Sequence, residues 1–119
     1  MIRTYFFAVS IALTSATQAA DKPAHLFILS GQSNMQGMNP KLGFEPETAK
    51  LLPNADVAYI KVSRGGQPIR LWVTEWNEIA KKTGLDSTSA GTKYYKPILE
   101  QFAELVKKHP DPASVTFCW

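Results

Sequence analysis

Residues 25–37, which read HLFILSGQSNMQG, decide the fold of this chain. The run from Ala24 to Leu29 is short, continuous and apolar, as is typical of a buried parallel strand. It is followed by Gly31, two residues before Ser33, and a small residue there permits a tight turn from strand to helix. The pattern therefore predicts that the Ser33 hydroxyl projects from the end of a buried strand, as an activated nucleophile requires.

Strands and helices alternate along the rest of the chain. Further strands are expected over residues 56–62 and 114–119, and helices over residues 47–52, 75–82 and 94–108. Thr74 is placed to cap the second helix and Gly84 to end it. This order predicts an α/β fold with a parallel sheet that has helices on both faces.

The helix expected over residues 94–108 has the strongest periodicity. Its apolar residues recur at spacings of three and four, which predicts one inner face made of Tyr95, Ile98, Leu99, Phe102, Leu105 and Val106. Pro97 is compatible with this helix only in the first turn.

The first twenty residues have the pattern of a secretory signal peptide. Arg3 provides a basic start, residues 5–13 an apolar centre, and Thr17-Gln18-Ala19 a small-residue cleavage site. The apolar centre is too short to span a bilayer. We therefore expect residues 1–20 to be removed on export to the periplasm, cell surface or medium. Residues 21–119 would then form one domain without a membrane span.

The composition is that of an ordinary globular domain. The 119 residues are 45% hydrophobic and 19% charged, with a net charge of +3. Scattered lysines and a single Arg64-Gly65-Gly66 element do not indicate a nucleic-acid interface. Cys118 is the only cysteine, so no internal disulfide is possible, and we expect it to be a buried strand residue. No cluster has metal-ligand spacing, so neither metal nor cofactor is expected.

A glycine pair follows the second expected strand as Ser33 follows the first. Because the carboxyl ends of parallel strands meet at one edge of a sheet, Gly65-Gly66 and Ser33 should share that edge. Backbone N–H groups of Ser33 and either glycine could then stabilise the oxyanion formed when a serine attacks a carbonyl. Arg70 and Trp72 would line the cleft. An ordinary turn and an ordinary glycine loop are the alternative interpretation.

Neither histidine is placed to act as the base for this serine. His25 lies at the other end of the strand that leads to Ser33, roughly 25 Å away at about 3.3 Å per residue. His109 precedes the third strand and should lie at the same far edge. Both are expected to have structural or solvent roles.

Two blocks carry a resemblance to a known family. The leader together with ILSGQSNM at residues 28–35 and RGGQPIRLW at residues 64–72 resembles the SGNH hydrolase superfamily, in particular its sialate O-acetylesterase-like carbohydrate esterases. The resemblance implies a three-layer α/β/α flavodoxin-like domain that removes acetyl groups from carbohydrates by a serine mechanism without metal or cofactor. It implies that Ser33 is the nucleophile and that Gly66 and Gly65 are oxyanion residues. We also expect the substrate to contact Gln32, Asn34 and Arg70.

Two further blocks of that family, Gln-Gly-Glu and Asp-x-x-His, do not occur in the 119 residues. Residues 115–119 resemble the approach to the first of them. We therefore expect the N-terminal portion of an exported esterase, truncated after the third strand, inactive as it stands, and with an unpaired apolar outer edge. The alternatives are an exported, non-catalytic carbohydrate-binding remnant, or an enzyme completed by another chain. The sequence favours no particular sugar or oligomeric state.

Overall fold

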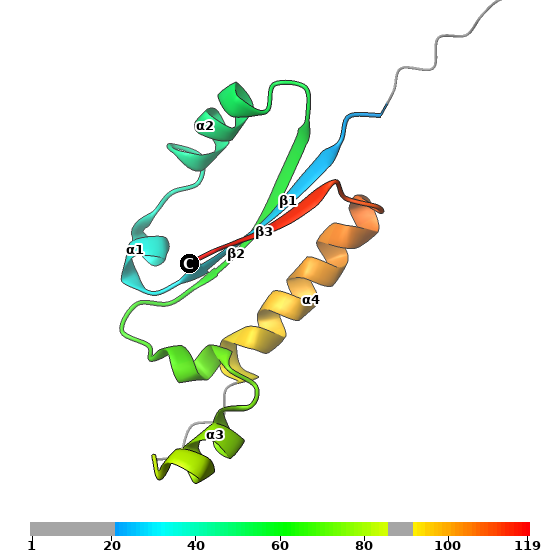
Figure 1. The fold of residues 1–119 in the computed structure, drawn as a ribbon. Coiled ribbons are helices and arrows are strands. Elements are labelled where there is room, and N and C mark those ends of the chain that lie inside the picture. Colours follow the sequence, from blue (N-terminus) through cyan, green and yellow to red (C-terminus); the bar gives the residue numbers. More distant parts are fainter. Residues whose placement is uncertain (1–20, 86–91) are drawn as a thin grey trace, which may run out of the picture.

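The structure, a computed structural model, describes residues 21–85 and 92–119 (Figure 1). The signal peptide expected over residues 1–20 lies outside the described residues. In chain order the elements are β1 (Ala24–Gly31), α1 (Ser33–Gly37), α2 (Phe44–Leu51), β2 (Asp56–Ser63), the 3₁₀ helix η1 (Ile69–Trp72), α3 (Trp76–Thr83), α4 (Thr92–Lys108) and β3 (Ser114–Cys118). No helix in the described ranges is long and apolar enough to cross a bilayer.

The three strands form a parallel sheet in the order β2-β1-β3, so β1 is central. Ile28 of β1 lies opposite Ile60 on one side and Phe117 on the other. The expected α/β class with a parallel sheet is therefore confirmed. The strand boundaries differ from the expected ones by no more than two residues, because continuous apolar runs identify buried strands well.

Helix α4 covers one face of the sheet (Figure 1). One core cluster on this side consists of five buried side chains, Ile60, Val62, Leu71, Trp72 and Ile98. Partly buried side chains pack against them from β1 and α4, namely Ile28, Tyr94, Phe102 and Leu105. Burying a side chain of this size stabilises a fold by roughly 1.5–3 kcal/mol. Leu71 and Trp72 therefore pack η1 against β2 and α4 through this cluster.

Helices α1 and α2 lie on the opposite face. Phe44 of α2 contacts Phe27 and Tyr59 edge to face, with ring centroids 5.0 and 5.3 Å apart. Lys61 of β2 donates from Nζ to the carbonyl oxygens of Gln36, at 3.2 Å, and Met38. A cation at these terminal carbonyls satisfies groups that a helix end leaves without partners. Both faces of the sheet therefore have helical cover, as expected.

Helix α4 corrects two of the sequence-based expectations. It begins at Thr92 rather than Tyr94, so Pro97 lies beyond the first turn. Tyr94, rather than Tyr95, faces the core and stacks on Trp72 with ring centroids 4.2 Å apart, while Tyr95 and Leu99 are exposed. The stacking partner decides which tyrosine turns inward, and helical periodicity contains no information about that partner.

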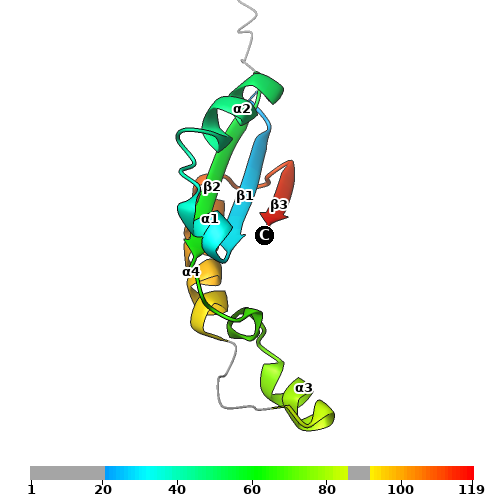
Figure 2. The ribbon, with the colours of Figure 1, turned by 90° about the vertical axis from the view of Figure 1, so that its left-hand side faces the viewer.

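Helices α2 and α3 also differ in their starts. Helix α2 begins three residues before the expected position, at Phe44, whose ring packs on the sheet. The N-cap of α3 is Glu75 rather than Thr74. Thr74 instead forms a hydrogen bond with the Glu75 carboxyl, which lowers the pKa of that carboxyl. Gly84 ends α3 as expected, and Figure 2 shows this helix beyond the carboxyl end of the sheet.

Among the described strands β3 pairs only with β1, so its outer edge is unpaired as expected, and it also has exposed apolar side chains. Val115 and Phe117 are 49% and 54% exposed. In register they lie beside Leu26 and Ile28 and therefore belong to the face that α4 covers over β2. The cover provided by α4 therefore does not extend fully over β3. Cys118, on the opposite face of this strand, was expected to be buried and is only partly buried.

Candidate functional site

The turn between β1 and α1 positions Ser33 at the carboxyl end of the central strand. Gly31 has φ +139°, a backbone conformation that residues with a side chain rarely adopt. A Cβ at this position would lie 3.4 Å from the Met35 Cβ and 3.7 Å from the carbonyl carbon of Trp119. Both distances are ordinary van der Waals contacts, so it is the backbone angle of the turn that requires glycine here.

Ser33 is exposed and lines a pocket of about 350 Å³. The other lining residues are Gln32, Asn34, Met35, Met38 and Trp119. Two amides, two thioethers and one indole therefore surround the serine. The volume falls in the range of pockets that hold small molecules.

The loop after β2 brings Gly65 against Ser33. A Cβ at Gly65 would lie 3.5 Å from both Cα and Cβ of Ser33, which is ordinary van der Waals contact, and 2.9 Å from Oε1 at the end of the Gln36 side chain. Gly66 has φ +68°, and a Cβ there would meet no atom within 4 Å. The structure thus brings Gly65 to the serine, while Gly66 faces open space. The proposed oxyanion role of each glycine stays a prediction.

Gln36 is a site residue that the sequence analysis missed. Its side-chain Oε1 accepts a hydrogen bond from the Gly65 backbone N–H. Gln36 follows Ser33 by three residues on α1, so both side chains lie on the same side of that helix. This spacing is the signal that could have identified it. An amide oxygen therefore already occupies a donor that an ester carbonyl would need.

Replacing Gln36 with alanine should expose the Gly65 amide. We expect amide hydrogen exchange at Gly65, measured by NMR, to accelerate about tenfold, because the replacement removes its acceptor. Gln36→Glu is the matched control, since it keeps an acceptor oxygen on a side chain of equal length and should preserve the protection. Equal exchange rates in the Gln36→Ala variant and the unaltered chain would contradict this contact.

The expected substrate-binding residues are distributed unevenly. Gln32 and Asn34 line the pocket beside Ser33, whereas Arg70 lies on η1, is half-buried and is not a lining residue. The Gln32 side chain donates from Nε2 to the backbone oxygen of Gln67. Gln32 therefore ties the loop after β1 to the loop after β2. The substrate contacts of these three residues stay predictions.

Ser30 forms a buried polar link behind the site, which the sequence analysis also missed. Its side chain is fully buried and donates from Oγ to the Val62 carbonyl oxygen at 2.7 Å. The same oxygen accepts from the Trp72 Nε1–H at 2.9 Å. Trp72 in turn meets the Trp119 ring edge to face, with centroids 5.1 Å apart. One hydroxyl thus joins β1, β2 and η1.

Both histidines lie at the amino end of the sheet, as expected. His25 Nδ1 is 2.7 Å from the Oγ of Ser114, the first residue of β3. His109 Nδ1 is 3.9 Å from Oδ2 of Asp56, the first residue of β2. Neither is near Ser33, which follows the carboxyl end of β1. Residues 21–85 and 92–119 also contain no group of three or more His, Cys, Asp or Glu that could hold a metal ion.

No family model, curated protein or solved structure matches this chain. The described residues define a parallel α/β sheet whose central strand leads to an exposed serine, with a glycine of the neighbouring loop against it. Chemically, this arrangement offers a hydroxyl in a pocket, with the Gly65 backbone beside the serine, although neither Gly65 nor Gly66 lines that pocket.

Proposed function

We propose that this chain supplies the nucleophile of a serine esterase that removes O-acetyl groups from carbohydrates. The observation that carries the proposal is the exposed Ser33 hydroxyl in a pocket, with the Gly65 backbone against it. The resemblance of residues 28–35 and 64–72 to the sialate O-acetylesterase-like SGNH hydrolases supports the same chemistry. In this proposal β2, β1 and β3 belong to a three-layer flavodoxin-like domain.

The proposed reaction begins when Ser33 Oγ attacks the acetyl carbonyl carbon. Negative charge then develops on the carbonyl oxygen, and preorganised N–H donors lower the energy of that state. Ser33, Gly65 and Gly66 are the candidate donors. Removing one such donor typically slows an acyl transfer by roughly 10²–10³-fold. The Gln36 amide must release the Gly65 N–H before that donor can serve the substrate.

The reaction also needs a general base within hydrogen-bond reach of Ser33 Oγ. Both described histidines interact with residues at the amino end of the sheet. We therefore propose that the histidine and its carboxylate come from polypeptide other than the described residues. The mechanism requires neither a metal nor a cofactor.

The pocket chemistry fits an acetylated sugar. Met35, Met38 and Trp119 offer apolar surface, while the amides of Gln32 and Asn34 can donate to and accept from hydroxyl groups. Trp119 is 52% exposed, so one aromatic surface is available to a sugar ring. We propose export directed by residues 1–20 as the route by which the protein reaches such substrates.

The test extends the reading frame past the Trp119 codon. The 119-residue chain should release acetate from acetylated xylose or sialic acid at the background rate, and the extended polypeptide should release it catalytically. An extended chain that has no histidine able to reach Ser33, and no activity on any acetyl ester, would refute the proposal.

A second candidate, a carbohydrate-binding remnant, rests on the exposed Trp119 beside the pocket and on the positions of the described histidines. In that case the 119-residue chain would retain acetylated sugars on a column without cleaving them. Failure of the chain to bind such sugars would exclude this candidate and leave the enzyme proposal intact.

A further inference from the structure

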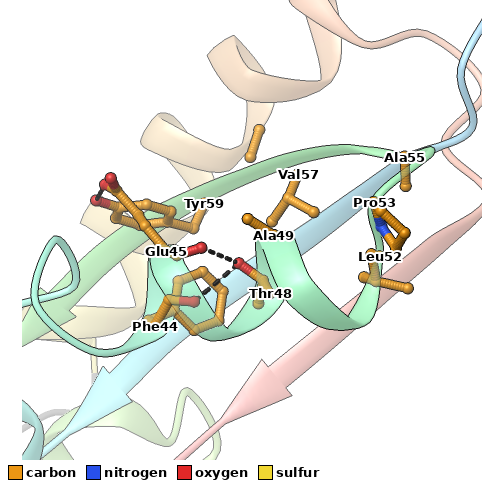
Figure 3. A pocket seen from close by; sticks show the side chains of 10 residues that line it. Phe44, Glu45, Thr48, Ala49, Leu52, Pro53, Ala55, Val57 and Tyr59 are labelled. Atoms are coloured by element: carbon orange, nitrogen blue, oxygen red, sulfur yellow. Dashed lines mark hydrogen bonds between the residues drawn. The ribbon is translucent and has the colours of Figure 1, made fainter.

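A second cavity lies between α2 and β2, and we name it the α2 groove. Its volume is about 390 Å³. Figure 3 shows its lining side chains, Phe44, Glu45, Thr48, Ala49, Leu52, Pro53, Ala55, Val57, Ala58 and Tyr59. None of these residues lines the Ser33 pocket. The groove lies along the amino-terminal half of β2, so it is a site separate from the proposed esterase chemistry.

The body of the α2 groove is apolar. Aliphatic and proline side chains line the end formed by Leu52, Pro53 and Ala55, and Val57 lines the floor on β2 (Figure 3). The Phe44 ring closes the other side and is held in place by its edge-to-face contact with Tyr59. Small-molecule sites typically combine such an apolar body with a few placed polar groups. The polar groups therefore decide which ligand fits.

The side-chain oxygens of the α2 groove are all acceptors. The Tyr59 hydroxyl donates its hydrogen to Glu45 Oε1 at 2.6 Å. The Thr48 hydroxyl donates to the Phe44 backbone oxygen at 2.8 Å. Both hydroxyl hydrogens are thus used inside the protein. The hydrogen bond to Glu45 also raises the pKa of Tyr59, which keeps this phenol protonated over a wider pH range.

The second carboxylate oxygen of Glu45 makes no hydrogen bond within the described residues. It lies at the end of the groove opposite Leu52 and Pro53 (Figure 3). A ligand head group at this end meets negative charge and no side-chain donor. An anion would be repelled, and a neutral acceptor would find no side-chain donor. An ammonium group supplies both positive charge and N–H donors, and it forms the stronger, charge-assisted kind of hydrogen bond.

We propose that the α2 groove binds a small organic ammonium compound, with its apolar body between α2 and β2 and its charged nitrogen at Glu45. Binding does not involve Ser33. It is a separate property of strand β2 and helix α2.

The test is an NMR titration of the 119-residue chain with 2-phenylethylammonium. We expect saturable amide shifts in α2 and in residues 57–59, with a Kd of about 1 mM, as is usual for a ligand of this size. Phenylacetate, which has the same ring and the opposite charge, should bind at least tenfold more weakly. Equal affinity for the two compounds, or shifts that do not saturate, would overturn the proposal.

Three variants test the role of the carboxylate. Glu45→Gln should weaken 2-phenylethylammonium binding about tenfold, because it removes the charge from an exposed side chain without changing its shape. Glu47→Gln is the matched control on the same helix. It removes an equal charge from a residue that pairs with Lys50 at 2.6 Å and does not line the groove, so affinity should change less than twofold. Tyr59→Phe should retain binding, because the carboxylate remains. Equal losses from the two glutamate variants would overturn the proposal.

Discussion

Replacing Ser33 with alanine is expected to lower kcat for acetyl-ester hydrolysis by about 10⁶-fold in the polypeptide that contains the histidine and carboxylate. Loss of the nucleophile in a serine hydrolase of unrelated fold has an effect of this size. The hydroxyl is exposed at the pocket, so its removal should leave the urea unfolding midpoint nearly unchanged. Initial rates of acetate release, compared with the equilibrium unfolding curve, separate catalysis from folding.

Ser114→Ala is the matched control for this experiment. It removes a serine hydroxyl at the opposite end of the sheet, where the group meets His25 at 2.7 Å. We expect kcat to change less than twofold. A Ser33→Ala variant that keeps its activity within tenfold would remove Ser33 from the mechanism, whatever the control shows.

The second large effect should follow from replacing Ser30 with alanine. This change leaves the Trp72 Nε1–H without its acceptor in the core and removes one hydrogen bond to the Val62 carbonyl oxygen. A buried polar group without a partner costs roughly 1–3 kcal/mol, so we expect the free energy of unfolding to fall by about 2 kcal/mol. Urea denaturation of the purified variant measures this change.

A double-mutant cycle tests whether the destabilisation acts through the indole. Trp72→Phe removes the N–H donor and keeps an aromatic ring that can stack on Tyr94. If the hydrogen bond carries the effect, Ser30→Ala should be less destabilising in the Trp72→Phe background, with a coupling of about 1 kcal/mol. Additive effects of the two replacements would show that the Ser30–Trp72 contact contributes no coupling.

The strands were predictable from the sequence because their apolar runs are short and continuous. Residues 24–29 and 56–62 differ from the observed β1 and β2 by one or two residues at the carboxyl end. The shared edge of Ser33 and the glycine pair followed from parallel topology alone. The observed approach of Gly65 to Ser33 agrees with that inference.

The parts that could not be predicted depend on tertiary contacts. Nothing local to Tyr94 and Tyr95 tells which ring stacks on Trp72, and the inward tyrosine was assigned wrongly. No local pattern indicates the role of Ser30, because its two partners come from β2 and η1. Gln36 was overlooked for the same reason, since its acceptor role depends on the loop after β2.

Gly31 is under a backbone constraint that does not depend on catalysis. Its φ of +139° is a backbone angle that residues with a side chain rarely adopt, although a Cβ there would make only ordinary contacts with Met35 and Trp119. Selection would keep a glycine there for its backbone conformation alone, even in a lineage that had lost the reaction. Retention of this glycine among related sequences would therefore be no sign that catalysis survives. The exposed serine two positions later is under no such steric constraint, and its loss or retention would be the informative record.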